Sequence, residues 1–204
     1  MSKLISTRDM AAVLAFSTML ITAFTGPIRA EQAINEARAV LVPGAGDYSR
    51  DISTDSATAQ QFFDQGLRLA WGFYFPESIA SYQEAARLDP DNPMPYWGMA
   101  HAMGPNPNSR YARMPDDPKG AGLEAINQAK SRLQHASALE KSLIQALFVL
   151  YDKDSIPDDA ERDQAYLAEM RTLNKTHPDD PDIAALYAAS YMSIGRWNYW
   201  DSNG

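Results

Sequence analysis

The chain has 204 residues, of which 45% are hydrophobic and 22% are charged, so it is long enough for one or two globular domains. It contains no cysteine, which excludes a disulfide framework, a thiolate nucleophile and thiolate metal ligands. The formal net charge is −8 and no run of basic residues occurs, which argues against nucleic acid and anionic membrane surfaces as partners.

The N-terminus has the pattern of a targeting segment. Lys3 and Arg8 are followed by an apolar run over residues 10–24 and by a small-residue cleavage site after Ala30. The apolar run is short for a transmembrane helix. We therefore expect residues 1–30 to be a signal peptide of an exported bacterial protein, periplasmic or secreted, with no membrane span after cleavage. An uncleaved N-terminal anchor is the alternative.

Residues 31–56 lack a sustained hydrophobic period and are rich in Gly, Pro, Ser and Asp over their second half. This composition predicts a flexible linker, with a short helix over residues 31–40 at most.

Residues 57–204 are expected to form an all-α domain, because helical periodicity recurs between turn signals. Thr58 and Gln61 have the spacing of a capping box for the first helix, and Ser137 and Glu140 have it for the fifth. The helices are expected near residues 58–71, 76–88, 95–103, 121–134, 138–150, 158–176 and 181–194.

The first two of these helices carry a repeat pattern. Small, aromatic, small and proline residues follow one another at Gly66, Tyr82, Ala85 and Pro90, which is the spacing of a tetratricopeptide repeat (TPR). Such a repeat buries its apolar face only by stacking on its neighbours. The pattern predicts an α-α solenoid of about three and a half TPR-like helical hairpins. An amphipathic bundle without repeats is the alternative.

The strings YWGMAHAMGPNPN (residues 96–108) and HPDDPDIAALYA (residues 177–188) extend this pattern. With them, residues 58–204 resemble a family of exported bacterial tetratricopeptide-repeat proteins that is largely uncharacterised. Its members are usually longer, so the resemblance implies that the repeat domain is incomplete at the C-terminus. The aromatic end around Trp197 would otherwise dock on another subunit.

The resemblance also implies a groove along the first helix of each repeat. In this sequence the matching positions carry an aromatic strip, Phe63, Trp71 and Trp97, beside His101. We expect these four residues to form a partner-binding groove with apolar anchors and one polar handle. Ordinary packing is the alternative.

A long loop over residues 104–119 interrupts the second repeat. Long insertions into compact repeats tend to be functional. We expect Asn106 and Asn108 to contact a ligand from a loop that caps the groove, although both side chains could only shape the loop.

No sequence pattern supports catalysis, a cofactor or a metal site. Met99, His101 and Met103 cannot converge on one ion from a regular helix, so the methionines are expected in the core. His135, His177 and Asp180 have the positions expected of helix-terminal residues.

The favoured function is therefore a cell-envelope scaffold that binds a protein or peptide segment, neutral or basic in charge. The alternatives are a small-molecule or metal-handling protein centred on His101, and the helical part of a larger enzyme.

Overall fold

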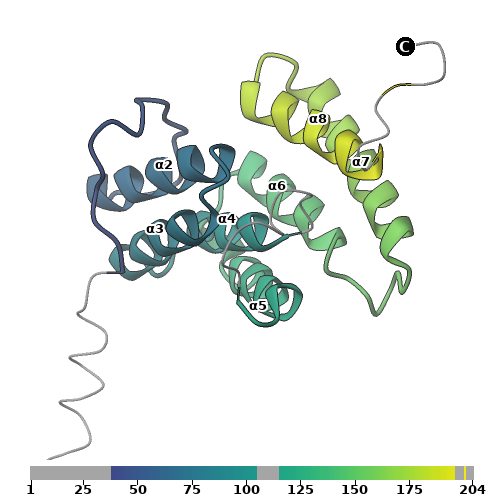
Figure 1. Cartoon of the computed structure of the whole chain (residues 1–204), viewed down its shortest axis with the longest axis horizontal. Coiled ribbons are helices and arrows are strands. Elements are labelled where there is room, and N and C mark those ends of the chain that lie inside the picture. The colour runs from purple at the N-terminus through teal and green to yellow at the C-terminus, as the bar shows by residue number, and fades with distance from the viewer. Residues whose placement is uncertain (1–37, 105–114, 196–199, 201–204) are drawn as a thin grey trace, which may run out of the picture. The chain divides into compact units, whose positions relative to one another are not determined.

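The computed structural model describes residues 38–104, 115–195 and 200. Over these residues the protein contains seven α-helices and no strand, which confirms the all-α class (Figure 1). In chain order they are α2 (Ala57–Trp71), α3 (Phe75–Leu88), α4 (Met94–Met103), α5 (Pro118–Lys130), α6 (Ala138–Val149), α7 (Asp159–Thr176) and α8 (Pro181–Gly195), with a 3₁₀ helix, Leu133–His135, before α6. In this part of the chain, no helix is both long and apolar enough to cross a membrane.

Polar side chains fix where the helices begin. The capping box of Ser137 and Glu140 is confirmed at the start of α6. The capping box of Thr58 and Gln61 is wrong, because α2 begins one residue before Thr58 and the side chain of Ser56 accepts the hydrogen bond from Ala59 N. Both Ser56 and Thr58 have cap-forming side chains, so the sequence pattern alone did not separate them.

Consecutive helices lie against one another. Contacts join α2 to α3, α3 to α4, α4 to α5, and α7 to α8, while α6 packs on α4, α5 and α7 (Figure 1). Helices that are two apart in the chain also touch, α2 with α4 and α4 with α6. Each helix therefore packs mainly against helices that are close to it in the sequence.

Tyr82 fills the space where three helices meet. Its ring is fully buried on α3, and a Cβ atom at Gly66 of α2 would lie 2.7 Å from it. A Cβ atom at Gly98 of α4 would lie 2.5 Å from the same ring. Real Cβ contacts are longer, so both positions need glycine for the helices to approach this closely.

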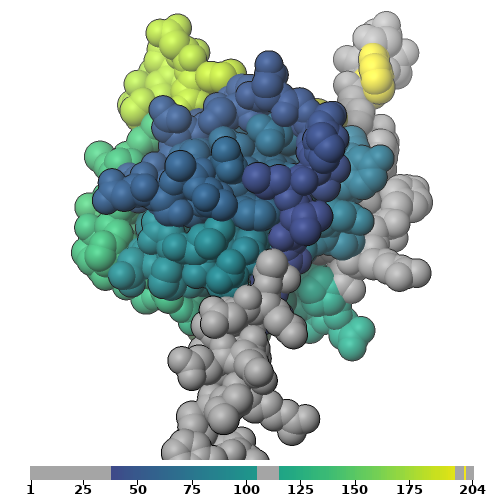
Figure 2. All heavy atoms as spheres, turned by 90° about the vertical axis from the view of Figure 1, so that its left-hand side faces the viewer, coloured from purple at the N-terminus to yellow at the C-terminus, as the bar shows by residue number. Residues whose placement is uncertain are grey.

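Residues 38–56 contain no helix or strand. Figure 2 shows the first part of this segment, coloured purple, lying on the surface of the neighbouring helices. Side chains of α2 and α3 hold it there. Gln65 bonds both Val42 N and Val40 O, and Glu84 accepts a hydrogen bond from Arg38 N. The rest of the region expected as a linker and short helix, residues 31–37, lies outside the described residues.

Candidate binding site

The structure places most of the expected aromatic strip inside the protein. Phe63 is 0% exposed and Trp97 is 2% exposed, while Trp71 is half-buried. The indole N–H of Trp97 donates to the carbonyl oxygen of Leu143 on α6 at 3.2 Å. Phe63 and Trp97 therefore pack helices together. Asn106 and Asn108, the expected contacts of the loop, lie outside the described residues.

His101 on α4 has a ring nitrogen that forms no hydrogen bond. Its ring stacks on Trp97, with centroids 5.4 Å apart and planes 5° apart, and approaches Trp71 at 6.0 Å. Its Nδ1 atom is buried and has no hydrogen-bond partner. Burial lowers the pKa of His101 to about 4, although the charge of Asp182 acts to raise it, so the imidazole is neutral at pH 7.

His101 lines a small pocket between two groups of helices. One wall comes from α4 and α6, and the other comes from α7 and α8. The pocket has a volume of about 50 Å³. Leucines and small residues line it together with a few polar groups: His101, Gly104, Leu147, Leu150, Asp163, Tyr166, Leu186, Ala189, Ser190 and Ser193.

The volume decides what such a pocket can hold. A small-molecule site typically encloses roughly 300–1,000 Å³, whereas one water needs on the order of 10–15 Å³. A space of about 50 Å³ accepts one short side chain or a few waters. A buried polar atom normally has a partner, so the unpaired Nδ1 atom of His101 is unusual for a residue that lines this pocket.

The two methionines on either side of His101 in the sequence lie in the core. Met99 and Met103 are both 8% exposed and belong to the apolar core, which confirms the expectation of core methionines. Among the described residues, no group of three or more His, Cys, Asp or Glu side chains could hold an ion.

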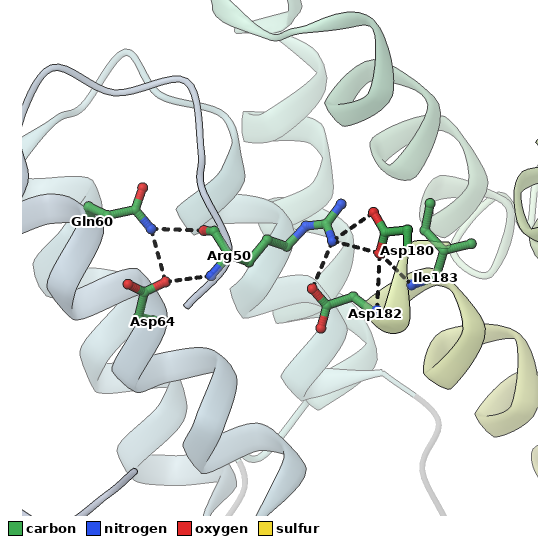
Figure 3. A network of polar contacts seen from close by, with 6 residues as sticks. All are labelled: Arg50, Gln60, Asp64, Asp180, Asp182 and Ile183. Atoms are coloured by element: carbon green, nitrogen blue, oxygen red, sulfur yellow. Dashed lines mark hydrogen bonds and ion pairs between the residues drawn. The ribbon is translucent and has the colours of Figure 1, made fainter. Parts of the chain in front are cut away.

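Sequence reasoning missed a second polar arrangement, in which side chains hold residues 48–53. Figure 3 shows the part of it around Arg50. Asp64 of α2 accepts a hydrogen bond from Arg50 N at 3.0 Å. Gln60, one turn earlier, donates to Arg50 O at 2.8 Å and accepts from Ile52 N at 3.0 Å. Glu140 of α6 accepts from Ser53 N at 2.8 Å.

The guanidinium group of Arg50 reaches the start of α8 (Figure 3). Its Nη1 atom lies 3.0 Å from Asp180 Oδ1 and 2.7 Å from Asp182 Oδ2, and the three side chains are only 8–19% exposed. Burial opposes the charged forms, but these hydrogen bonds outweigh it. They raise the pKa of Arg50 and, with the N–H of Ile183, lower the pKa of Asp180.

Asp180 also has the capping role that the sequence predicted, since its Oδ1 atom accepts hydrogen bonds from Asp182 N and Ile183 N. Its pairing with Arg50 was not foreseen because the two residues are 130 positions apart in sequence. Gln60 and Asp64 are four residues apart and therefore lie on one face of α2, which is a local sequence signal of a polar surface there.

Comparison of the chain with protein-family models, with curated proteins and with solved structures gave no match. The two arrangements are therefore interpreted from their own geometry.

Proposed function

We propose that the protein is a TPR-like scaffold of the cell envelope that binds an extended segment of a partner protein. Three observations support the repeat arrangement. The helices form pairs α2–α3, α4–α5 and α6–α7 followed by α8, and the first helices of the pairs touch in sequence. The small and aromatic positions of the first repeat also meet, at Gly66 and Tyr82.

The observation that carries the proposal is a pocket the size of one side chain that is lined by His101, a residue whose Nδ1 atom has no hydrogen-bond partner. An extended peptide offers such side chains one at a time, and pockets of this kind supply specificity in peptide recognition. The neutral imidazole favours an uncharged hydrogen-bonding group. The net charge of −8 favours a partner that is neutral or basic as a whole.

A small molecule held by His101 is the second candidate function. The same unpaired nitrogen favours it, because a ligand could complete the hydrogen bond. The pocket volume of about 50 Å³ argues against a ligand of cofactor size. We propose neither a catalytic role nor a cofactor, and we take export through residues 1–30 as part of the proposal.

The test is a selection of random peptides displayed on phage against the full chain. Ala189 lines the pocket on α8, whereas its neighbour Ala188 is exposed and does not. We expect Ala189→Leu to fill the pocket and weaken binding of the selected peptides at least tenfold. The matched variant Ala188→Leu should bind them as the wild-type chain does.

Two results would overturn the proposal. One is a selection that enriches no peptide on the wild-type chain. The other is a set of peptides that bind Ala189→Leu and wild type equally, because the His101 pocket would then have no part in recognition. Circular dichroism of each variant checks that the helices are intact.

A further inference from the structure

The segment over residues 48–53 is held in the way that a bound peptide is held. It contains no helix or strand, so its backbone groups lack the regular partners that such elements supply. Side chains of other elements bond to them instead, at Arg50 N and O, Ile52 N, and Ser53 N and O. Arg68 adds a bond to Tyr48 O at 2.6 Å.

Two side chains of the segment, one charged and one apolar, contribute to the sequence specificity of the contact. Arg50 lies between the carboxylates of Asp180 and Asp182. Ile52 is 8% exposed and belongs to the apolar core. Main-chain bonds supply affinity and side-chain contacts supply specificity in peptide recognition by grooves and strand edges.

Serine hydroxyl groups before and after Arg50 in the sequence also donate hydrogen bonds to the surface. Ser49 Oγ donates to Asp64 at 2.7 Å, and Ser53 Oγ donates to Glu140 Oε2 at 2.5 Å. Asp51, between Arg50 and Ile52, is exposed. The surface therefore selects four positions and leaves one open, a pattern written Ser-Arg-x-aliphatic-Ser.

We infer that the surface formed by α2 and the N-terminal ends of α6 and α8 is a second peptide-binding site, and that residues 48–53 are its resident ligand. The partner that fits it is an extended segment carrying Ser-Arg-x-aliphatic-Ser. The carboxylates of Asp180 and Asp182 face the guanidinium group of Arg50, and those of Asp64 and Glu140 accept hydrogen bonds from backbone N–H groups of the segment. Four carboxylates against one arginine of the segment favour a basic segment. This inference adds a site and a partner sequence to the proposed scaffold function.

The way residues 48–53 are attached to the rest of the chain allows a partner segment to replace them. Gly44 and Gly46, just before it, both have φ of +87°, a backbone conformation that places a turn at its start. A short tether presents its own segment to the site at an effective concentration on the order of millimolar. A partner segment that binds the site more tightly can therefore displace it.

The first test is native-state hydrogen exchange on the full wild-type chain. If the segment is a displaceable ligand, the amides of Arg50, Ile52 and Ser53 exchange through a local opening, at least tenfold faster than the core amides of α2 and α4. If they exchange only together with those core amides, the segment is a fixed part of the fold and the inference is overturned.

The second test uses a blocked, fluorescent peptide with the sequence of residues 47–55. Its binding is measured to the full Arg50→Ala chain, whose own segment lacks the arginine contact. We expect the peptide to bind this variant at least tenfold more tightly than it binds the wild-type chain. A peptide in which the residue matching Arg50 is alanine should bind the variant at least tenfold more weakly than the unchanged peptide does. Adding Asp180→Asn to the Arg50→Ala chain keeps a cap-forming side chain and should weaken binding.

Equal binding to the wild-type and Arg50→Ala chains, or none to either, would overturn the inference. If Arg50→Ala loses its helical circular dichroism, the hydrogen-exchange result on the wild-type chain decides. These outcomes are separate from those of the phage selection, because Ala189 and His101 lie in the other pocket.

Discussion

His101 shows how one buried group sets the chemistry of the proposed site. The ring lies against Trp97 and Trp71, and Nδ1 is shielded from water without a partner in the protein. An isolated charge in such surroundings would be unfavourable, so the imidazole stays neutral. Hydrogen bonding, not charge, is therefore what His101 offers to a ligand.

The same burial predicts a pH dependence of stability. The pKa of His101 falls from 6.5 to about 4 on folding, so the unfolded chain takes up a proton first as the solution is acidified. The free energy of unfolding is therefore highest above pH 6.5, where His101 is neutral in both states, and it falls as the pH is lowered towards 4. The slope from one such group is at most about 1.4 kcal/mol per pH unit.

Urea unfolding at several pH values between 6.5 and 4 checks this prediction. We expect His101→Gln to have a smaller slope of unfolding free energy against pH than wild type. His135→Gln, which removes an exposed imidazole, serves as the control and should keep the wild-type slope. An unchanged slope in His101→Gln would show that His101 does not titrate as proposed.

Among the helices, the start of α2 tests how well local sequence fixes an element. Ser56 Oγ accepts from Ala59 N at 3.2 Å, whereas Thr58 lies within the first turn. We expect Ser56→Ala to lower the free energy of unfolding by about 1 kcal/mol, the usual effect of losing an N-cap. Thr58→Ala should be neutral or slightly stabilising, because alanine is the better helix former.

Thermal and urea denaturation of the two variants make the comparison directly. The structure would be contradicted if Thr58→Ala were the more damaging change, because the helix would then start where the sequence pattern placed it.

Helix existence and type could be predicted from the sequence because their signals are local. The capping box at Ser137 and the cap at Asp180 each need only a few neighbouring residues. Contacts far apart in sequence have no such signal. Whether Trp97 is buried depends on Leu143, 46 residues away, and the ion pair of Arg50 depends on α8. Two of the residues expected in the groove, Phe63 and Trp97, are therefore residues that the structure uses for packing.

The molecule as a whole depends on close helix approach around Tyr82. Gly98→Ala would put a methyl group 2.5 Å from that buried ring. Overpacking of this kind typically costs about 1–3 kcal/mol, and the better helix propensity of alanine recovers at most about 1 kcal/mol. We expect a net loss of stability, measured by urea unfolding.

A double-mutant cycle supplies the control for this packing. In a Tyr82→Leu background the ring is gone, so Gly98→Ala should be less harmful than in the wild-type chain. If Gly98→Ala stabilised the wild-type chain, the stacking of α2, α3 and α4 described here would be wrong.

The central claim is that the His101 pocket receives one side chain of a partner peptide. Nitrogen NMR of the His101 imidazole during titration with a selected peptide tests it most directly. The account predicts a saturable shift of Nδ1 in the wild-type and Ala188→Leu chains and none in Ala189→Leu. A peptide that binds the wild-type chain to saturation while the His101 signal stays unchanged would contradict it.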